Sequence, residues 1–479
     1  MNYSMIRYTL GWLLVFEAVF LAIPLITSLC YLEPEALAFL LSSLIALLFG
    51  VLLIYKKPKN TSIYAKDGFV IVSLSWIMLS LFGALPFIFS GSTKSFTDAL
   101  FETVSGFTTT GASIFSEVES LSHGILMWRS FTHWIGGMGV LVFIMAFLPL
   151  SGGHNMHIMR AESPGPDVSK LVPRMKKTAI ILYAIYFVMT VIMFVILLFS
   201  GMEIFDAVNT AFSTAGTGGF GFKNDSFASA TAAQQIIVTV FMLLFSINFN
   251  SYYLVLKLKF KEAFNSEVKI FIAIVFAVIM SITLNILHQF DGNFGEALRH
   301  AAFTAASLIS TTGFATENFN LWPELSRTLL VLIMFVGACA GSTGGGIKIS
   351  RIIILFKGFI RELKMTVRPR QVKKITIDGR PVEHEVVRSV NAYIVCYIVI
   401  FVLSLLAISF ENHDLITNFT AVTATLNNIG PGLGGVGPIE NYGDFSIFSK
   451  LVLIFDMLAG RLELFPMLIL FTPSTYKKV

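Results

Sequence analysis

Four polar segments of the same length each end on a glycine, and threonines stand beside most of these glycines. They are 98–111 (DALFETVSGFTTTG), 206–219 (DAVNTAFSTAGTGG), 300–313 (HAAFTAASLISTTG) and 417–430 (TNFTAVTATLNNIG). Glycine permits backbone angles that turn successive carbonyl oxygens to one side. Because a ring of carbonyl oxygens can replace the water shell of a cation, these residue types predict an ion filter of the potassium type.

The predicted ion-binding residues are the last three of each segment: Thr109, Thr110, Gly111, Thr217, Gly218, Gly219, Thr311, Thr312, Gly313, Asn428, Ile429 and Gly430. Threonine hydroxyls can fix the strained backbone or add ligands. The alternative is that each glycine only permits close packing of helices. Four glycines at matching positions favour the filter. The fourth segment lacks the threonines of the first and third, so the predicted ring is only quasi-symmetric.

A second unusual stretch is 337–348, GACAGSTGGGIK. Each glycine costs about 0.8–1.0 kcal/mol of helix stability relative to alanine, so the stretch predicts a break in a helix. We expect a gate below the filter, formed by Gly337, Gly341, Ser342, Thr343, Gly344, Gly345, Gly346, Lys348 and Arg461. A flexible kink without function is the alternative. A nucleotide-binding phosphate loop is disfavoured because the lysine comes one residue late and no Ser or Thr directly follows it.

Arg461 lies about sixteen residues into the last apolar run. A charge at that depth costs roughly 2.5–3.5 kcal/mol on insertion scales. We therefore expect Arg461 to face a water-filled pore, with Asp456 and Glu463 as possible partners. The alternative is that its long side chain reaches back to the cytoplasmic surface.

The composition defines the setting of these segments. The chain has 479 residues, of which 55% are apolar and 13% charged, and its mean hydropathy is +0.77, which excludes a water-soluble protein. Ten apolar runs are long enough to cross a bilayer: 10–32, 37–55, 68–90, 126–150, 178–200, 234–256, 269–289, 327–356, 388–410 and 446–472. The first run has no small-residue cleavage pattern after it, so we expect a retained span.

Lysine and arginine gather in alternate connections, and the intervening loops are acidic or weakly charged. The basic groups are Lys56 to Lys66, Arg160 to Lys177, Lys257 to Lys261, and Lys348 to Lys374. The positive-inside rule then places both termini in the cytoplasm. The four polar segments fall in outer loops and are too polar to cross.

The recurring unit is a span, a short re-entrant helix, a glycine turn and a second span. We therefore predict an all-α polytopic membrane protein with four quasi-repeats of span, pore helix and span around one pore, plus an N-terminal helical pair. The predicted domains are the N-terminal transmembrane hairpin 1–60, pore repeat 1 at 61–165, pore repeat 2 at 166–262, pore repeat 3 with its gating loop at 263–374, and pore repeat 4 at 375–479.

The sequence offers little for other chemistry. No Ser-His-Asp set, paired catalytic carboxylates or dinucleotide fingerprint can be placed, so an enzyme is not expected. The cysteines Cys30, Cys339 and Cys396 lie in apolar runs without metal-ligand spacing, and we interpret them as packing residues. His154 and His157 lack nearby carboxylates, and a metal site there is disfavoured.

The motifs STTGF, NNIGPGLG, GACAGSTGGGIK and AGRLE, with the fourfold unit, resemble the TrkH-type members of the Trk/Ktr/HKT superfamily of potassium-uptake proteins. The resemblance covers essentially the whole chain. It implies potassium uptake across the cytoplasmic (inner) membrane of a prokaryote, with the potassium ion as bound substrate and no organic cofactor. It also implies one filter per chain, a gate at 337–348, a homodimer and a cytosolic ring of nucleotide-binding TrkA-type regulatory subunits. Relatives that prefer sodium replace the first glycine with serine, so Gly111 implies potassium.

Two other functions remain open. The first is a cation-coupled secondary transporter, a sodium or proton symporter of potassium. Such folds often have inverted repeats, whereas these four units share one polarity, which favours a channel-like pore. A membrane scaffold or receptor is the second, and it predicts no cation flux. The lipid membrane is one expected partner. The basic connection 357–388 is a candidate docking surface for a soluble partner, because the alternating pattern of ITIDGRPVEHEV suits a small hairpin. A solvated linker is the alternative, and no nucleic-acid partner is expected.

Overall fold

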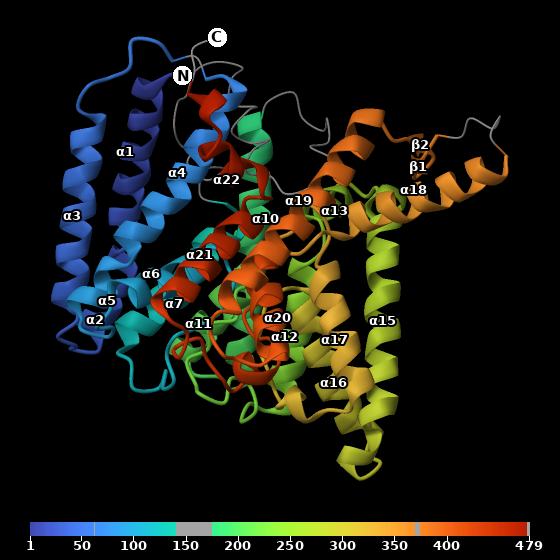
Figure 1. Cartoon of the computed structure of the whole chain (residues 1–479). Helices are drawn as coiled ribbons and strands as arrows, with labels where there is room; N and C mark the ends of the chain where they lie inside the picture. Colours follow the sequence, from blue (N-terminus) through green and yellow to red (C-terminus); the bar gives the residue numbers. More distant parts are fainter. Residues whose placement is uncertain (62, 140–174, 369–373, 477–479) are drawn as a thin grey trace.

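The computed structural model describes residues 1–61, 63–139, 175–368 and 374–476, and nearly all regular structure within them is helical (Figure 1). The predicted all-α class is confirmed. The chain begins with a helical pair made of α1 (Tyr3–Phe20), α2 (Ala22–Cys30) and α3 (Ala36–Ile54). Gly11 on α1 faces Gly50 on α3 so closely that a Cβ on either glycine would lie 2.9 Å from the carbonyl oxygen of the other.

Four units of span, short helix and span follow this pair. The first contains α4 (Ala65–Gly83), α5 (Leu85–Phe89), α6 (Phe96–Phe107) and α7 (His123–Gly137). The second contains α10 (Met175–Phe199), α11 (Ile204–Gly216), α12 (Ala232–Phe245), α13 (Phe249–Leu256) and α14 (Phe260–Ala263). The boundaries that we drew between units at the sequence level stay predictions.

The third unit is followed by the only strands in the described part of the chain. Its helices are α15 (Ser266–Ile286), η1 (Leu287–Phe290), α16 (Phe294–Ile309), η2 (Phe319–Leu321), α17 (Glu324–Val336) and α18 (Ile349–Val367). A small antiparallel hairpin follows, made of β1 (Thr376–Ile377) and β2 (Arg380–Pro381). Asp378 and Gly379 both have positive φ, as a tight two-residue hairpin turn requires. The predicted hairpin is therefore present.

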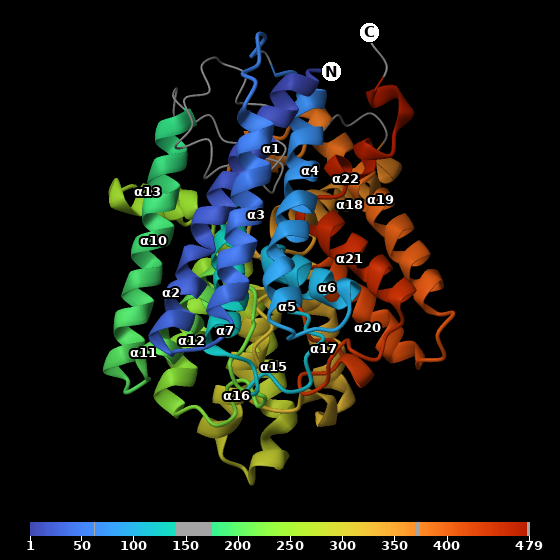
Figure 2. The same cartoon turned by 90° about the vertical axis from the view of Figure 1, so that its left-hand side faces the viewer.

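The fourth unit completes the molecule. It contains α19 (His384–Ile408), α20 (Leu415–Leu426), η3 (Gly434–Val436), α21 (Ile447–Arg461), α22 (Phe465–Leu470) and η4 (Pro473–Thr475). Figure 1 places both termini and the hairpin at one end of the molecule, and Figure 2 shows the same arrangement from the side. The short helices α6, α11, α16 and α20 lie in the half away from the termini.

Several of the ten expected spans are interrupted. In the described residues, six helices are long and apolar enough to cross a bilayer, or seven if a bent pair counts as one span. That pair is α12 and α13, which meet at 90°, so the continuous span expected at 234–256 is wrong. The run at 327–356 breaks between α17 and α18, and the run at 446–472 breaks between α21 and α22. The second half of 126–150 lies outside the described residues.

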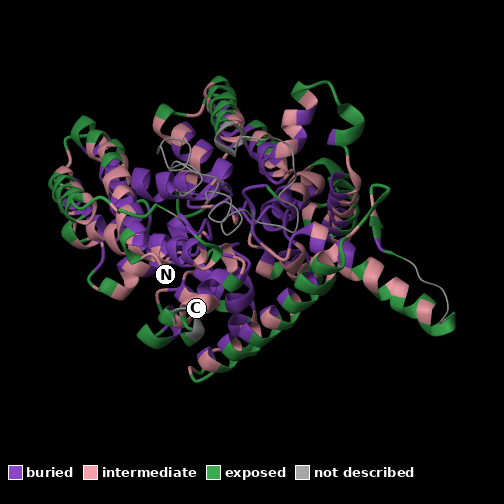
Figure 3. Ribbon diagram, turned by 90° about the horizontal axis from the view of Figure 1, so that it is seen from above, coloured by how far each residue is buried: buried purple, intermediate pink, exposed green. Residues whose placement is uncertain are grey.

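Apolar side chains fill the centre and also coat the rim. Seen along the long axis in Figure 3, buried residues gather in the middle and exposed residues lie at the edge. Many rim residues are leucines, including Leu44, Leu48 and Leu52 of α3. A lipid environment explains such a surface, because the hydrocarbon chains take the place of water there.

Candidate functional site

The four short helices end in the same backbone geometry. Each stops three or four residues before its glycine, and we number the turns that follow loop 1 (to Gly111), loop 2 (to Gly219), loop 3 (to Gly313) and loop 4 (to Gly430). The residue two positions before each glycine is left-handed: Thr109 (φ 55°), Thr217 (φ 53°), Thr311 (φ 59°) and Asn428 (φ 56°). A β-branched residue with positive φ is an outlier. The repetition shows that the four loops share one conformation.

The glycines of the loops form a closed ring. Each of them has positive φ, and a Cβ added to it would lie less than 3.0 Å from the carbonyl oxygen that precedes the glycine of the next loop. These contacts run from Gly111 to Gly218, from Gly219 to Thr312, from Gly313 to Ile429, and from Gly430 back to Thr110. The structure therefore brings together the glycines and carbonyl oxygens that the sequence placed in a filter.

Side chains next to the ring form hydrogen bonds that hold the loops in place. Thr110 Oγ1 lies 2.8 Å from Thr108 Oγ1, and Thr312 Oγ1 lies 2.7 Å from Ser310 Oγ, so loops 1 and 3 use the same device. In loop 4, Asn428 Nδ2 donates to Thr110 Oγ1 at 3.0 Å and so ties loop 4 to loop 1. The hydroxyls could either fix the strained backbone or add ion ligands, and these contacts support the first role.

The helix ends give the ring its electrostatics. The C-terminal ends of α6, α11, α16 and α20 lead directly into the loops. A helix C-terminus carries about half a negative charge from its aligned peptide dipoles. Four such ends around one ring favour a cation at its centre.

The glycine-rich loop 337–348 lies against loops 3 and 4. Gly345 N donates to Thr311 Oγ1 at 2.7 Å, and a Cβ on Gly345 would lie less than 3.0 Å from the carbonyl oxygen of Asn427. On the opposite side, Glu267 of α15 accepts from Ala340 N at 2.8 Å. The loop is therefore held by specific hydrogen bonds, and the sequence predicted neither Thr311 nor Glu267 as a partner.

The same loop also satisfies the backbone of the bend between α12 and α13. Cys339 N donates to Ser246 O at 3.0 Å, Thr343 Oγ1 donates to Phe245 O at 3.1 Å, and Phe249 N donates to Gly341 O at 3.0 Å. Unpaired backbone groups at membrane depth cost several kcal/mol each. The two helix breaks thus supply each other's hydrogen-bond partners.

Arg461 and Lys348 both bind carbonyl oxygens of this region. Arg461 donates to Thr343 O at 2.9 Å and to Gly137 O at 2.8 Å, which joins the loop to the end of α7. Lys348 is buried and its Nζ donates to Gly344 O. Six of the other expected gate residues form the loop itself: Gly337, Gly341, Ser342, Gly344, Gly345 and Gly346.

The carboxylates proposed as partners of Arg461 contact other residues. Glu463 forms an ion pair with Arg351 of α18. Asp456 Oδ1 accepts from Ser404 Oγ of α19 at 2.6 Å. The guanidinium carbon of Arg351 also lies 3.9 Å from the ring centroid of Tyr393 of α19. These contacts engage both carboxylates with other residues, and their pairing with Arg461 stays a prediction.

Sequence reasoning missed the side chains that hold the ring from outside. Tyr442 Oη donates to the carbonyl of Gly430 itself at 2.7 Å. Arg129 and His133 of α7 contact loop 2. The sequence did contain a signal for Arg129 and His133, because these two residues lie one helical turn apart and interrupt a mostly apolar run.

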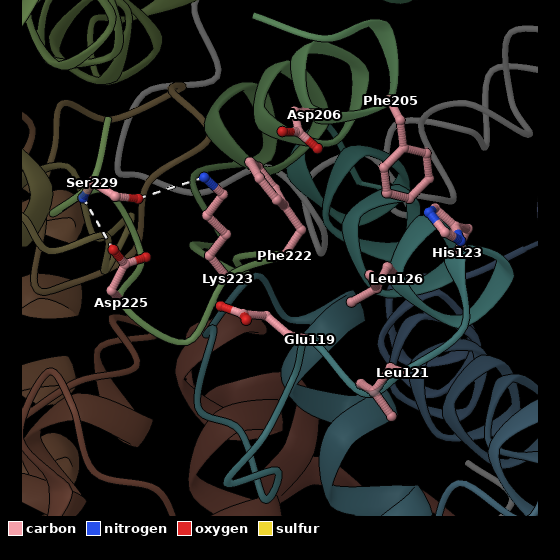
Figure 4. A pocket seen from close by; sticks show the side chains of 10 residues that line it. All are labelled: Glu119, Leu121, His123, Leu126, Phe205, Asp206, Phe222, Lys223, Asp225 and Ser229. Atoms are coloured by element: carbon pink, nitrogen blue, oxygen red, sulfur yellow. Dashed lines mark hydrogen bonds between the residues drawn. The ribbon is translucent and has the colours of Figure 1, made fainter. Parts of the chain in front are cut away.

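A pocket of about 450 Å³ is lined by residues of α7, α11, the segment before α7 and the segment after loop 2 (Figure 4). Its polar lining includes Glu119, Asp206, Lys223, Asp225 and Ser229. Burial, and then the nearby charge of Glu203, raise the pKa of Asp206. Asp225 Oδ2 accepts from Ser229 N at 3.1 Å, so part of this lining is engaged in local turns. None of its lining residues belongs to the ring, and we assign no function to it.

The described residues contain no group of three or more His, Cys, Asp or Glu that could hold a metal ion. His154 and His157 lie outside the described residues. The candidate site therefore consists of the loop ring and the segment below it.

Four units of span, short helix and span around one ring of loops define a multi-repeat membrane transport protein. The chain belongs to the TrkH family of cation transport proteins, whose model matches residues 36–477. It is 36% identical to the Trk system potassium uptake protein TrkH of Escherichia coli K12 over the full length of both chains. It is 32% identical to the Trk system potassium uptake protein TrkG of the same organism, over 98% of this chain and 99% of the relative.

A solved structure supports the fold. The crystal structure of the potassium transporter TrkH from Vibrio parahaemolyticus superposes with a TM-score of 0.89 at 33% sequence identity and covers all of both chains. The class predicted from the motifs is therefore confirmed, and the chain is a multi-pass membrane protein of a transport family.

Proposed function

We propose that the chain takes up potassium across the cytoplasmic membrane of a prokaryote through a channel-like pore. The observation that carries this proposal is the closed ring, in which each loop glycine abuts the carbonyl oxygen before the next glycine. The twelve residues predicted from the sequence supply this ring, and the potassium ion is the substrate held there. The names of the full-length relatives, which are potassium uptake proteins, support the same function.

Uptake of rubidium, a potassium analogue, into potassium-starved cells that lack their own transporters tests this function. Expression of the chain should restore uptake, and excess sodium should compete only weakly. A scaffold or receptor would give no uptake above the empty vector, which would contradict the proposal. Repeating the assay in proteoliposomes at a fixed membrane potential, with and without sodium or proton gradients, distinguishes a channel from a symporter.

We further propose that the loop 337–348 and Arg461 form a gate beneath the ring. The loop contacts Thr311 of loop 3 directly, and Arg461 binds the loop carbonyl of Thr343. A cation leaving the ring meets two positive side chains, the buried Lys348 and the half-buried Arg461. Fixed positive charges near a pore raise a barrier to cations.

The proposed partners are a second copy of the chain and a cytosolic nucleotide-binding TrkA-type regulatory subunit. Support for the docking surface comes from α18 and the β1–β2 hairpin, which lie at the end of the molecule that holds both termini (Figure 1). Lys357 Nζ donates to Thr376 O at 2.7 Å and Ser266 N donates to Asp378 Oδ1 at 2.9 Å, so the hairpin is held in place. We propose that this end, with both termini, is cytoplasmic.

Site-specific crosslinking tests the docking surface. Arg370 of the basic connection 357–388 lies outside the described residues, so Lys374 is the primary site. A photocrosslinker at Lys374 should capture the co-expressed regulatory subunit. The matched control is Lys94, which is exposed at the opposite end. Equal capture at Lys94, or persistent failure at Lys374, would contradict the proposed surface.

A further inference from the structure

The four junctions between neighbouring loops are held by different contacts. The junction of loops 4 and 1 uses Asn428, as described above. The junction of loops 2 and 3 uses backbone, with Phe227 N donating to Ala315 O at 2.9 Å. At the junction of loops 3 and 4, Asn320 Oδ1 accepts from Gly434 N at 3.1 Å. The junction of loops 1 and 2 is held by the imidazole of His133 and by the buried ion pair of Arg129 and Glu102. It is the only one of the four described junctions that uses an imidazole and an ion pair.

His133 of α7 connects the end of the first pore helix to loop 2. Its side chain is fully buried, its Nδ1 lies 2.8 Å from Gly106 O, and its Nε2 lies 3.2 Å from Phe220 N. A carbonyl oxygen only accepts and an amide N–H only donates. His133 is therefore a neutral imidazole with its proton on Nδ1, donating to α6 and accepting from the residue that follows Gly219.

The imidazole also sets how far loop 2 can move outward. A Cβ on Gly218 would lie less than 3.0 Å from Cγ of His133, so the ring packs directly on the loop backbone. The imidazole and the ring of Phe220 have their centroids 4.3 Å apart. Because Gly218 supplies the carbonyl that faces Gly111, His133 lies immediately behind an oxygen of the ring.

Arg129, one helical turn before His133, holds the outer ends of the same two loops. It forms an ion pair with Glu102 of α6 at 2.8 Å, with side chains 2% and 0% exposed, and donates to Gly221 O at 3.0 Å. Glu102 in turn accepts from Ile114 N at 3.0 Å. A buried ion pair is weak evidence for stability, but it restricts its neighbours to one geometry.

We propose that His133 is a specificity-determining positioning residue for the filter. This rests on the proposed function. Its two hydrogen bonds and its ring fix the distance between the end of α6 and loop 2, and so the position of the Gly218 oxygen relative to Gly111. Without the imidazole, loop 2 is free to relax into the space left behind it. The ring then holds a dehydrated potassium ion less well, and the preference for potassium over sodium falls while conduction continues.

Two substitutions distinguish the effect of the His133 hydrogen bonds from the effect of its side-chain volume. Glutamine carries both a donor and an acceptor on one amide, so His133→Gln can keep both contacts, whereas His133→Leu keeps neither. The purified full-length variants are compared in proteoliposomes by the ratio of potassium to sodium flux at fixed voltage. We expect His133→Leu to lower this ratio roughly tenfold, the scale of one or two net hydrogen bonds, and His133→Gln to restore most of it.

The control is a second buried histidine away from the ring. His300 of α16 is 5% exposed, has its Nδ1 2.9 Å from Thr316 Oγ1, and stacks on Phe290. His300→Leu should leave the flux ratio unchanged, which shows that loss of a buried histidine alone does not alter selectivity. Gel filtration and thermal melting of each variant report folding.

The outcomes separate this proposal from the proposed function. An unchanged flux ratio in folded His133→Leu, or a His133→Gln variant as unselective as His133→Leu, would overturn the role of His133. If His133→Leu does not fold, His133→Asn replaces it, since its shorter amide cannot span both partners; equal selectivity of the Asn and Gln variants would then overturn the proposal. Absence of potassium flux in the parent protein would instead overturn the proposed function.

Discussion

At the residue scale, the informative feature is strain that recurs. Three threonines and one asparagine adopt left-handed backbone at equivalent positions of the four loops, and each precedes a residue whose carbonyl faces a neighbouring glycine. Such conformations cost about 1–3 kcal/mol each and persist only where the surrounding structure imposes them. Their fourfold recurrence indicates that the loops are shaped for the ring.

Gly313→Ser should weaken the preference for potassium over sodium. The new Cβ would lie less than 3.0 Å from the carbonyl oxygen of Ile429 and 2.8 Å from Cδ of Pro431, at a φ of 91°. The oxygen of loop 4 must therefore move. Competition of sodium against rubidium uptake measures the effect, and we expect the sodium inhibition constant to fall several-fold.

Gly91→Ser is the matched control for this substitution. Gly91 also has positive φ, at 72°, but a Cβ there meets nothing within 4 Å. It carries the same backbone penalty without disturbing the ring. If Gly313→Ser and Gly91→Ser transport with the same ion preference and affinity as the parent, the filter assignment is wrong.

At the scale of elements, two broken helices depend on each other. The bend between α12 and α13 and the break between α17 and α18 exchange hydrogen bonds, and Arg461 at the end of α21 joins them to α7. Neither break would be stable alone at membrane depth, because its backbone groups would lack partners. The loop 337–348 is therefore held as one part of an assembly of all four repeats.

Arg461→Ala should raise basal potassium flux and reduce its dependence on the regulatory subunit, with little change in ion preference. The substitution frees the Thr343 carbonyl and removes a positive charge below the ring. Removal of Ala340–Gly345 should act in the same direction by removing the obstruction. Flux of purified protein in proteoliposomes, with and without the subunit, measures both effects.

Arg299→Ala provides the comparison for Arg461→Ala. Arg299 forms an ion pair with Glu296 at 3.6 Å on α16, away from the glycine-rich loop. Its loss should leave basal flux unchanged. If the gate variants fold but leak no more than the parent, or change selectivity and leave the rate untouched, the loop is a packing kink and no gate.

At the scale of the whole molecule, one ion pair connects the proposed docking surface to the gate. Arg351 near the start of α18 pairs with Glu463, which lies two residues after Arg461 and has positive φ, at 57°. Arg351 also stacks on Tyr393 of α19. A movement of α18 therefore reaches the backbone that carries Arg461.

Glu463→Gln should reduce the response of flux to the regulatory subunit about several-fold, because removing one partner of a largely buried pair leaves the other charge uncompensated. Glu362→Gln is the control, since the Arg361–Glu362 pair on the same helix is exposed on the Glu side at 62%. Flux at saturating subunit, divided by flux without it, is the measurement. The same ratio in the parent and in Glu463→Gln would exclude this connection.

The sequence by itself determined the features that depend on local composition. Apolar length predicted the helices, and glycine with threonine at matching positions predicted four equivalent loops. Charge distribution placed both termini on one side. The hairpin at 376–381 also follows from a local signal, because Asp-Gly between alternating residues favours a tight turn. Each of these properties is encoded within a few residues or turns.

Tertiary structure alone decided which groups meet. His133 binds residues 27 and 87 positions away in the chain, and Asn428 reaches Thr110 across 318 positions. The bend at 246–248 and the pairing of Glu463 with Arg351 were also not predictable, since both depend on partners from other repeats. The physical reason is that a buried polar group must find a partner. Which partner it finds depends on how the four repeats pack around the ring, and no local pattern records that packing.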